Sequence, residues 1–518
     1  MSQRPGEFAS PPGSSSDFSL SRWLWLTAGL SLLLRGWIAV TFPVTGDEAF
    51  FYWWGVFPDW GYYDHPPMVG WLIALMLRVL GDTTWSIRVP AVLLPLALGG
   101  ALWWALKPLS RERAAWAVLL FWLAPFNWLN MMVTTDTPLI FWSMLSVAAL
   151  LRAEQRTAMD GRGWALYALS GFFLGCAFLS KYFSVVLGLT YAVYFVVYRR
   201  DRLLPFVLLV LCALHGPAIN VAYNMSHGWS NIMFNVYNRN EGASFEWRKP
   251  LTYVAMMAYL ITPAVLWLGW RGRRALREAL GQHRLLACLV LVPLGFFALL
   301  SLKKVVGLHW VMSFYPFGFA LLAFALPTDA LRSTAKGVAV FCGLHVVAVA
   351  GLYATQLPQW QGAKLYPEIV QSYRTQELLD QVRAPGVVLM GSSYSPAAIY
   401  GYTLHDYVPV WGPGDFHARQ DDMLVDFSIY QGKTVRILHI EQPTLDKFQP
   451  YFDSVRLYSV TQDHATFYVV EGTAFNFEAY RRGPLTDAYK QFYNIPQWLP
   501  MTGCPFCERL CGKVRCNP

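Results

Sequence analysis

The chain has 518 residues, of which 55% are hydrophobic and 14% are charged. Soluble domains carry about 25% charged residues, so this composition excludes an ordinary soluble protein and predicts a polytopic α-helical membrane protein. The net charge is +9 at pH 7. The basic residues cluster between apolar segments, where they orient a membrane protein, and we therefore expect no nucleic-acid partner.

Residues 1–20 are predicted to form a disordered cytoplasmic tail, because residues 1–17 are rich in Pro, Gly and Ser. No small-residue cleavage site follows the first apolar run, so we expect this run to be retained as a helix. Apolar segments then alternate with polar loops as far as residue 355. They predict about 11 transmembrane helices, near residues 23–43, 88–106, 114–133, 138–151, 164–180, 183–198, 203–222, 251–270, 285–301, 310–326 and 337–355.

The loops between these segments are of two kinds. By the positive-inside rule the basic loops lie in the cytoplasm, namely Lys107–Arg113, Arg152–Arg162, Arg199–Arg202, Arg271–Arg284 and Arg332–Lys336. The other loops carry acids and aromatic residues and are assigned to the outer face, namely Thr45–Pro67, Thr134–Pro138, Lys181–Tyr182, Tyr223–Pro250 and Ser301–His309. Residues 66–80 are too short to span, and we expect a re-entrant or interfacial helix there.

The composition changes after Gln356. Residues 386–402 predict a strand, a turn and a helix, and residues 434–440 and 464–472 predict two further strands. We therefore expect a transmembrane catalytic domain at 21–355, a small extracytoplasmic α/β domain at 356–500 and a Cys-rich tail at 501–518. The tail cysteines are predicted to form two disulfides, to bind zinc or to remain as free or intermolecular thiols, and they are Cys504, Cys507, Cys511 and Cys516.

Carboxylates gather in the loops assigned to the outer face. Asp47 and Glu48 follow the first span, and Asp136 lies between the third and the fourth. Acids at a membrane boundary often mark function, as a base or as ligands of a divalent metal ion. The alternative is that they are solvated or cap helices. The three acids are our candidate catalytic residues, and Asp47 and Asp136 are the possible metal ligands.

Cations occur on the same face, where the positive-inside rule disfavours them. An anionic lipid substrate would explain their presence, because Lys and Arg bind phosphate by charge. The alternative is that lysines near helix ends reach towards the interface. The candidate substrate-binding residues are Asp64, His65, Arg88, Lys181, Tyr182, Lys303, Lys304 and His309.

The acidic pair in "GDEAFFYWWG" is followed in order by "YYDHPP", "TTDTPLIFW", "LSKYF" and "LKKVVGLHW". This order resembles the bacterial protein mannosyltransferase/aminoarabinose (lipid A) transferase superfamily, whose members are membrane glycosyltransferases of the C fold. The resemblance covers most of residues 20–330. The segments "GSSYSPAAIYGY" and "GPGDFHARQDD" are similar to the extracytoplasmic domain of such enzymes. The Cys-rich tail is not a family feature, and no protein-mannosyltransferase-type inserted domain is apparent.

The resemblance implies transfer of a sugar from a polyprenyl-phosphate donor to an acceptor on the outer side of the bacterial cytoplasmic (inner) membrane. Asp47 matches the catalytic acid and Asp136 matches the second outer acid. The lysine-bearing loops with Lys181 and with Lys303 and Lys304 are similar to those placed near the lipid phosphate. The role of His65 stays open, and so does the use of a divalent metal ion. Lipid A or lipopolysaccharide is the favoured acceptor, with another envelope glycan or a protein as alternatives.

Two other functions compete with the transferase. A lipid or glycolipid transporter would be favoured by charges within the spans and by mirrored halves, and neither feature is apparent. A non-catalytic assembly protein does not explain why acids and cations gather on one face.

Overall fold

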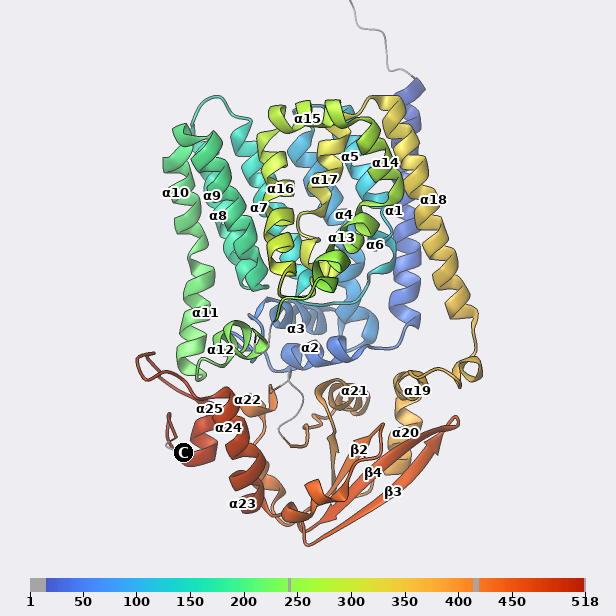
Figure 1. Cartoon of the computed structure of the whole chain (residues 1–518), viewed down its shortest axis with the longest axis vertical. Coiled ribbons are helices and arrows are strands. Elements are labelled where there is room, and N and C mark those ends of the chain that lie inside the picture. Colours follow the sequence, from blue (N-terminus) through green and yellow to red (C-terminus); the bar gives the residue numbers. More distant parts are fainter. Residues whose placement is uncertain (1–14, 241–243, 413–418, 517–518) are drawn as a thin grey trace, which may run out of the picture.

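The computed structural model of the chain describes residues 15–240, 244–412 and 419–516 (Figure 1). A helical bundle is followed by a smaller domain that contains a β-sheet. The predicted tail at 1–14 and residues 413–418, within the segment "GPGDFHARQDD", lie outside the described residues. The prediction that residues 15–20 are disordered is wrong, because helix α1 begins at Ser15. Leu20 is buried in the core of the bundle, which favours helix over disorder there.

Thirteen of the described helices lie along the bundle or pack within it. They are α1 (Ser15–Thr41), α4 (Thr84–Leu106), α5 (Arg111–Leu123), α7 (Asp136–Glu154), α8 (Gly161–Phe178), α9 (Val185–Tyr198), α10 (Leu203–Ala213), α11 (His215–Ser226), α13 (Arg248–Ile261), α14 (Pro263–Arg271), α16 (Arg284–Ser301), α17 (Tyr315–Ala325) and α18 (Thr328–Ala354). Side chains of Thr83, Ser110 and Asp160 cap the N-termini of α4, α5 and α8.

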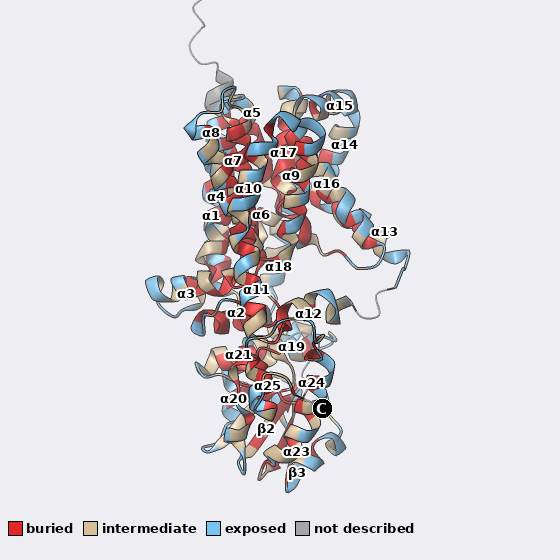
Figure 2. Ribbon diagram, turned by 90° about the vertical axis from the view of Figure 1, so that its left-hand side faces the viewer, coloured by how far each residue is buried: buried red, intermediate tan, exposed pale blue. Residues whose placement is uncertain are grey.

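Both the core and the outer surface of the bundle are apolar. Buried residues fill the space between the helices (Figure 2), and large apolar side chains such as Trp25, Leu33 and Leu299 are more than 70% exposed. An apolar exterior of this extent suits a hydrocarbon environment rather than water. The structure therefore supports an integral membrane protein.

Each predicted span is helical, but several are interrupted. In the described residues, five helices are long and apolar enough to cross a membrane, or six if α13 and α14 form one broken span with a bend of 86°. Helix α7 carries Asp136, Arg152 and Glu154 at its ends, which lowers its mean hydropathy. The count of 11 transmembrane helices therefore stays a prediction, whereas the polytopic helical character is confirmed.

The two ends of the bundle differ. Helix α15 (Arg273–Gln282), which lies in a predicted basic loop, crosses one end (Figure 1). Helices α2 (Gly46–Val56), α3 (Met68–Leu80) and α12 (Ser230–Val236), which come from the acid-bearing loops, lie at the other end beside the sheet-containing domain (Figure 1). Helix α3 occupies the segment that was expected not to span.

The smaller domain contains a four-stranded sheet with the order β1-β2-β4-β3. The strands are β1 (Val387–Gly391), β2 (Thr434–His439), β3 (Ser454–Gln462) and β4 (Ala465–Thr473). β1 pairs parallel with β2, and the other pairs are antiparallel. Three strands lie where the sequence predicted them. β3 was missed, although the alternating polar and apolar residues of Ser454–Leu457 are the signal of a half-exposed strand. The helices before and between the strands include α19 (Tyr366–Tyr373), α20 (Thr375–Val382) and α21 (Tyr394–Leu404).

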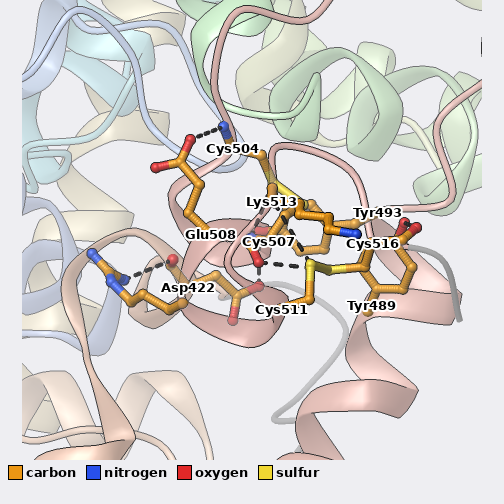
Figure 3. Close-up of a disulfide and its surroundings, with 10 residues drawn as sticks. Asp422, Tyr489, Tyr493, Cys504, Cys507, Glu508, Cys511, Lys513 and Cys516 are labelled. Carbon is orange, nitrogen blue, oxygen red and sulfur yellow. Dashed lines mark hydrogen bonds between the residues drawn. A yellow bond between two sulfur atoms is a disulfide. The ribbon is translucent and has the colours of Figure 1, made fainter.

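The C-terminal segment packs on this domain rather than apart from it. It contains α23 (Phe477–Tyr480), α24 (Thr486–Phe492) and α25 (Pro505–Cys511), whereas α22 (Asp421–Leu424) lies between β1 and β2. The structure joins Cys504 to Cys507 and Cys511 to Cys516, which is the disulfide alternative for the tail (Figure 3). Arg509 donates to the backbone oxygens of Asp422, Met423 and Val425, and thereby ties the tail to the domain.

Candidate active site

The first acid-bearing loop ends in a helix whose start is fixed by its own side chains. The Thr45 side chain accepts from the Glu48 backbone N–H, and the Glu48 carboxylate accepts from the Thr45 backbone N–H, which forms a capping box. Asp47 lies in the first turn of α2, where the helix dipole favours a negative charge. The sequence "TGDE" thus places Asp47 at an exposed position at the start of the helix.

Glu48 forms a buried ion pair with Arg88 of α4. The Arg88 Nε and Nη2 atoms donate to the two carboxylate oxygens at 2.8 and 2.7 Å, and both side chains are 0% exposed. The remaining guanidinium donors reach the backbone oxygens of Ala39, Phe42 and Pro43. All five donors of Arg88 are used, so this pair fixes the loop beneath Asp47 and is closed to a substrate.

Asp47 meets the smaller domain. The Tyr394 hydroxyl at the start of α21 donates to Asp47 Oδ1 at 3.1 Å, across 347 positions of sequence. A Cβ on Gly46 would lie 1.6 Å from the Ser395 Oγ atom, so only glycine allows α21 to approach this closely. The smaller domain therefore contributes a side chain, Tyr394, directly to the candidate catalytic acid.

Asp64 is buried beside the same loop. Its Oδ1 atom has no hydrogen-bond partner among the described residues, and its Oδ2 atom lies 3.7 Å from His65 Nε2. Burial raises the pKa of Asp64 to about 7, the charge of Asp47 adds to this rise, and the charge of Arg239 opposes it. An acid with this pKa can exchange a proton near neutral pH.

Asp136 and Lys181 form a second buried pair at the same end of the bundle. Lys181 Nζ donates to both carboxylate oxygens of Asp136, at 2.9 and 2.8 Å. His309 Nε2 lies 3.9 Å from Asp136 Oδ2, and its side chain is 51% exposed. Partial burial lowers the pKa of His309, while Asp136 and Asp47 raise it and Lys181 and Arg239 lower it further. These groups therefore share one electrostatic environment.

Arg239 was missed as a candidate residue. It belongs to the turn Asn238–Asn240, and its charge acts on Asp64, His309 and Lys304. Lys304 Nζ donates to the Arg239 backbone oxygen at 3.1 Å, and burial together with the Arg239 charge lowers the pKa of Lys304. The signal was present in the sequence, because this arginine lies in a loop assigned to the outer face, where positive charge is disfavoured.

The side chains of two candidate residues take part in none of the hydrogen bonds and ion pairs described above. The Tyr182 hydroxyl lies within hydrogen-bonding distance of the side-chain oxygens of Asn220 and Asn231 and donates its one proton between them, so it holds helices together. Lys303 is exposed, and its backbone oxygen accepts from Lys249 Nζ at 3.3 Å.

The described residues hold no group of three or more His, Cys, Asp or Glu side chains arranged to bind a metal ion. Both Asp136 oxygens already accept from Lys181. A metal ion at Asp136 would therefore require this pair to open, whereas Asp47 is exposed.

The chain is similar to known proteins over part of its length. The family described as dolichyl-phosphate-mannose-protein mannosyltransferase matches residues 64–221. Lipid A galacturonosyltransferase RgtD from Rhizobium johnstonii is 26% identical over 230 residues, which are 41% of this chain and 48% of that protein. The match thus spans about half the length of this relative.

Two solved structures of ArnT from Cupriavidus metallidurans have a similar fold. The apo structure superposes with a TM-score of 0.62 and the structure bound to undecaprenyl phosphate with 0.64. Each comparison covers 87% of this chain and 98% of the ArnT chain, at 15% identity. The fold expected from the sequence resemblance is confirmed, since the chain has the same overall fold as ArnT, and residues 64–221 match the protein-mannosyltransferase family model.

Proposed function

We propose that this chain transfers a sugar from a polyprenyl-phosphate donor to an envelope acceptor, with a lipid A or lipopolysaccharide-type glycan as the favoured acceptor, on the outer side of the bacterial inner membrane. One observation carries the proposal. Acids and cations from separate loops converge at one end of an apolar bundle, where a lipid-linked donor and a polar acceptor can meet. The names of RgtD and of the ArnT complex with undecaprenyl phosphate support a lipid-type acceptor and this donor class.

The chemistry requires two operations at once. The bond between the anomeric carbon and the phosphate oxygen breaks, and the departing phosphate keeps the electron pair. The acceptor oxygen or nitrogen bonds to the anomeric carbon and loses its proton. The site must therefore hold a base near the acceptor and positive charge near the phosphate.

Asp47 is our candidate for the base. It is exposed, and the Tyr394 hydroxyl orients it. Asp64 supports this role, because burial raises its pKa to about 7 and so lets it accept or release a proton near neutral pH.

Arg239, Lys304 and His309 are our candidates for holding the phosphate. Lys181 is less accessible than these, because it is 7% exposed and its charge is neutralised by Asp136. We assign the Asp136–Lys181 pair the role of positioning His309 at the edge of the site. A divalent ion bound through Asp47 is the alternative way to neutralise the phosphate, and addition of EDTA to the assay separates the two.

Mass spectrometry of envelope glycolipids and glycoproteins tests the proposal. The strains compared are the intact strain, a deletion strain, and the deletion strain complemented with wild type, Asp47→Asn or Asp446→Asn. Asp446 is an exposed acid in the smaller domain, away from the site, and serves as the matched control. We expect one glycan to lose a sugar in the deletion strain and Asp446→Asn to restore it.

Asp47→Asn should restore less than about 1% of the product, because removal of a general base costs about 10²–10⁴ in rate. Equal restoration by the two variants, with equal amounts of protein in the membrane, would reject Asp47 as the base and favour the transporter alternative. The glycan that changes identifies the acceptor.

A further inference from the structure

A groove runs along the outside of the bundle between α1, α5 and α18. Its volume is 650 Å³, and its walls include Trp23 and Leu30 of α1, Trp116 of α5 and Val347 of α18. Trp116 is buried and forms the floor, whereas Trp23, Leu30 and Val347 are more than half exposed. A Cβ on Gly343 would meet no atom within 4 Å, so the groove is open at this point.

One end of the groove is positively charged. Arg332 and Lys336 line it and lie one helical turn apart on the same face of α18. No acid is among the described residues that line it. The nearest carboxylate partner of Arg332 is Asp329, whose Oδ1 atom lies 3.6 Å from Nη1 and whose side chain is 96% exposed. The groove therefore combines an apolar length with a cationic end.

The dimensions match one membrane leaflet. From position 332 to position 347 the helix rises about 22 Å, at 1.5 Å per residue. A bilayer is about 40–45 Å thick including its headgroup regions, so one leaflet spans about 20–22 Å. An acyl chain can lie along α1 and α18 while its phosphate stays at the level of the two cations.

We propose that this groove binds an anionic phospholipid of the leaflet next to the basic loops, with its phosphate on Arg332 and Lys336. The groove lies away from the candidate active site, because α18 begins at the end of the bundle that α15 crosses (Figure 1). The proposal therefore holds or fails independently of the proposed function. Basic pockets between transmembrane helices on the cytoplasmic side bind anionic head groups in this way.

Native mass spectrometry of the full chain tests the proposal. The protein is exchanged into a mixture of phosphatidylglycerol and phosphatidylethanolamine and then stripped gradually with detergent. Wild type should retain phosphatidylglycerol over phosphatidylethanolamine. Each cation near a membrane surface contributes about fivefold in affinity for an anionic lipid, so R332Q/K336Q should weaken retention by about 25-fold.

The matched control is R274Q/R277Q on α15, which removes the same charge from exposed positions outside the groove. It should keep retention within about twofold of wild type. D329N removes the carboxylate that competes for Arg332 and should raise retention by up to about threefold.

Three results would overturn the proposal. They are equal retention by the groove and control variants, equal retention of both lipids by wild type, and a dimer mass that depends on Arg332 and Lys336 in place of bound lipid. The last result would assign the groove to a second copy of the chain.

Discussion

Arg88→Lys should destabilise the protein strongly although it preserves the charge. Arg88 makes five hydrogen bonds, two to Glu48 and three to backbone oxygens, and its side chain is 0% exposed. A lysine has three donors, so at least two buried acceptors lose their partners. Each buried acceptor without a partner costs about 1–3 kcal/mol, so two of them cost about 2–6 kcal/mol in total.

The expected change in the midpoint of thermal unfolding follows from this loss of stability. At about 2.1 cal/mol/K per residue, the 518-residue chain has an unfolding entropy of about 1.1 kcal/mol/K. Arg88→Lys should therefore lower the midpoint by about 2–5 °C. A thiol-reactive dye measures it, because Cys176, Cys288 and Cys342 are free and buried in the folded protein.

Arg374→Lys is the matched control. Arg374 also contacts acids, Glu377 at 3.2 Å and Asp463 at 3.1 Å, but its side chain is 48% exposed. Surface pairs contribute about 0–1 kcal/mol, so this variant should lower the midpoint by no more than about 1 °C. Equal shifts for the two variants would refute the argument that the buried guanidinium depends on all five of its bonds.

Three further outcomes follow from the structure. Asp64→Asn should stabilise the protein relative to wild type, and increasingly so as the pH rises from about 4 to 7. The pKa of Asp64 is raised in the folded state, so wild type loses stability as Asp64 ionises, whereas the variant does not. Thermal midpoints of both proteins at pH 5 and pH 8 check this, and a difference between them that does not change with pH contradicts it. Tyr394→Phe should lower product formation about 5–30-fold with an unchanged midpoint, because Asp47 loses one exposed hydrogen bond; full activity would remove Tyr394 from the site. Cys511→Ser/Cys516→Ser should lower the stability of the smaller domain by about 2 kcal/mol, because the loop that this disulfide closes, although short, restricts the unfolded chain. Limited proteolysis measures the loss, and an unchanged cleavage rate would contradict that estimate.

The sequence predicted the parts of the site that lie within single loops. Asp47, Asp136 and Lys181 were identified because acids and cations stand out between apolar segments. The strands of the smaller domain that carry continuous apolar residues were also found. The edge strand β3 was missed, although the alternation of polar and apolar residues at its start was present in the sequence.

The roles within the site could not be predicted in the same way. Glu48 and Arg88 are charged residues near the ends of apolar segments, as Asp47 and Lys181 are. The fold nevertheless brings Glu48 and Arg88, 40 positions apart in sequence, together as a buried ion pair. Arg239 was within reach of the sequence, since it is a cation in an outer loop. Tyr394 was not, because its contact with Asp47 spans 347 positions.

Composition and the spacing of charges by themselves determined that this chain is a polytopic membrane protein with acid-bearing loops on one face, since burial in hydrocarbon restricts where charges can lie. Motif order pointed to the glycosyltransferase C fold. Only the tertiary structure decided which carboxylates are available to a substrate and which are locked in ion pairs, because the free energy of a buried charge depends on the partners that packing brings to it.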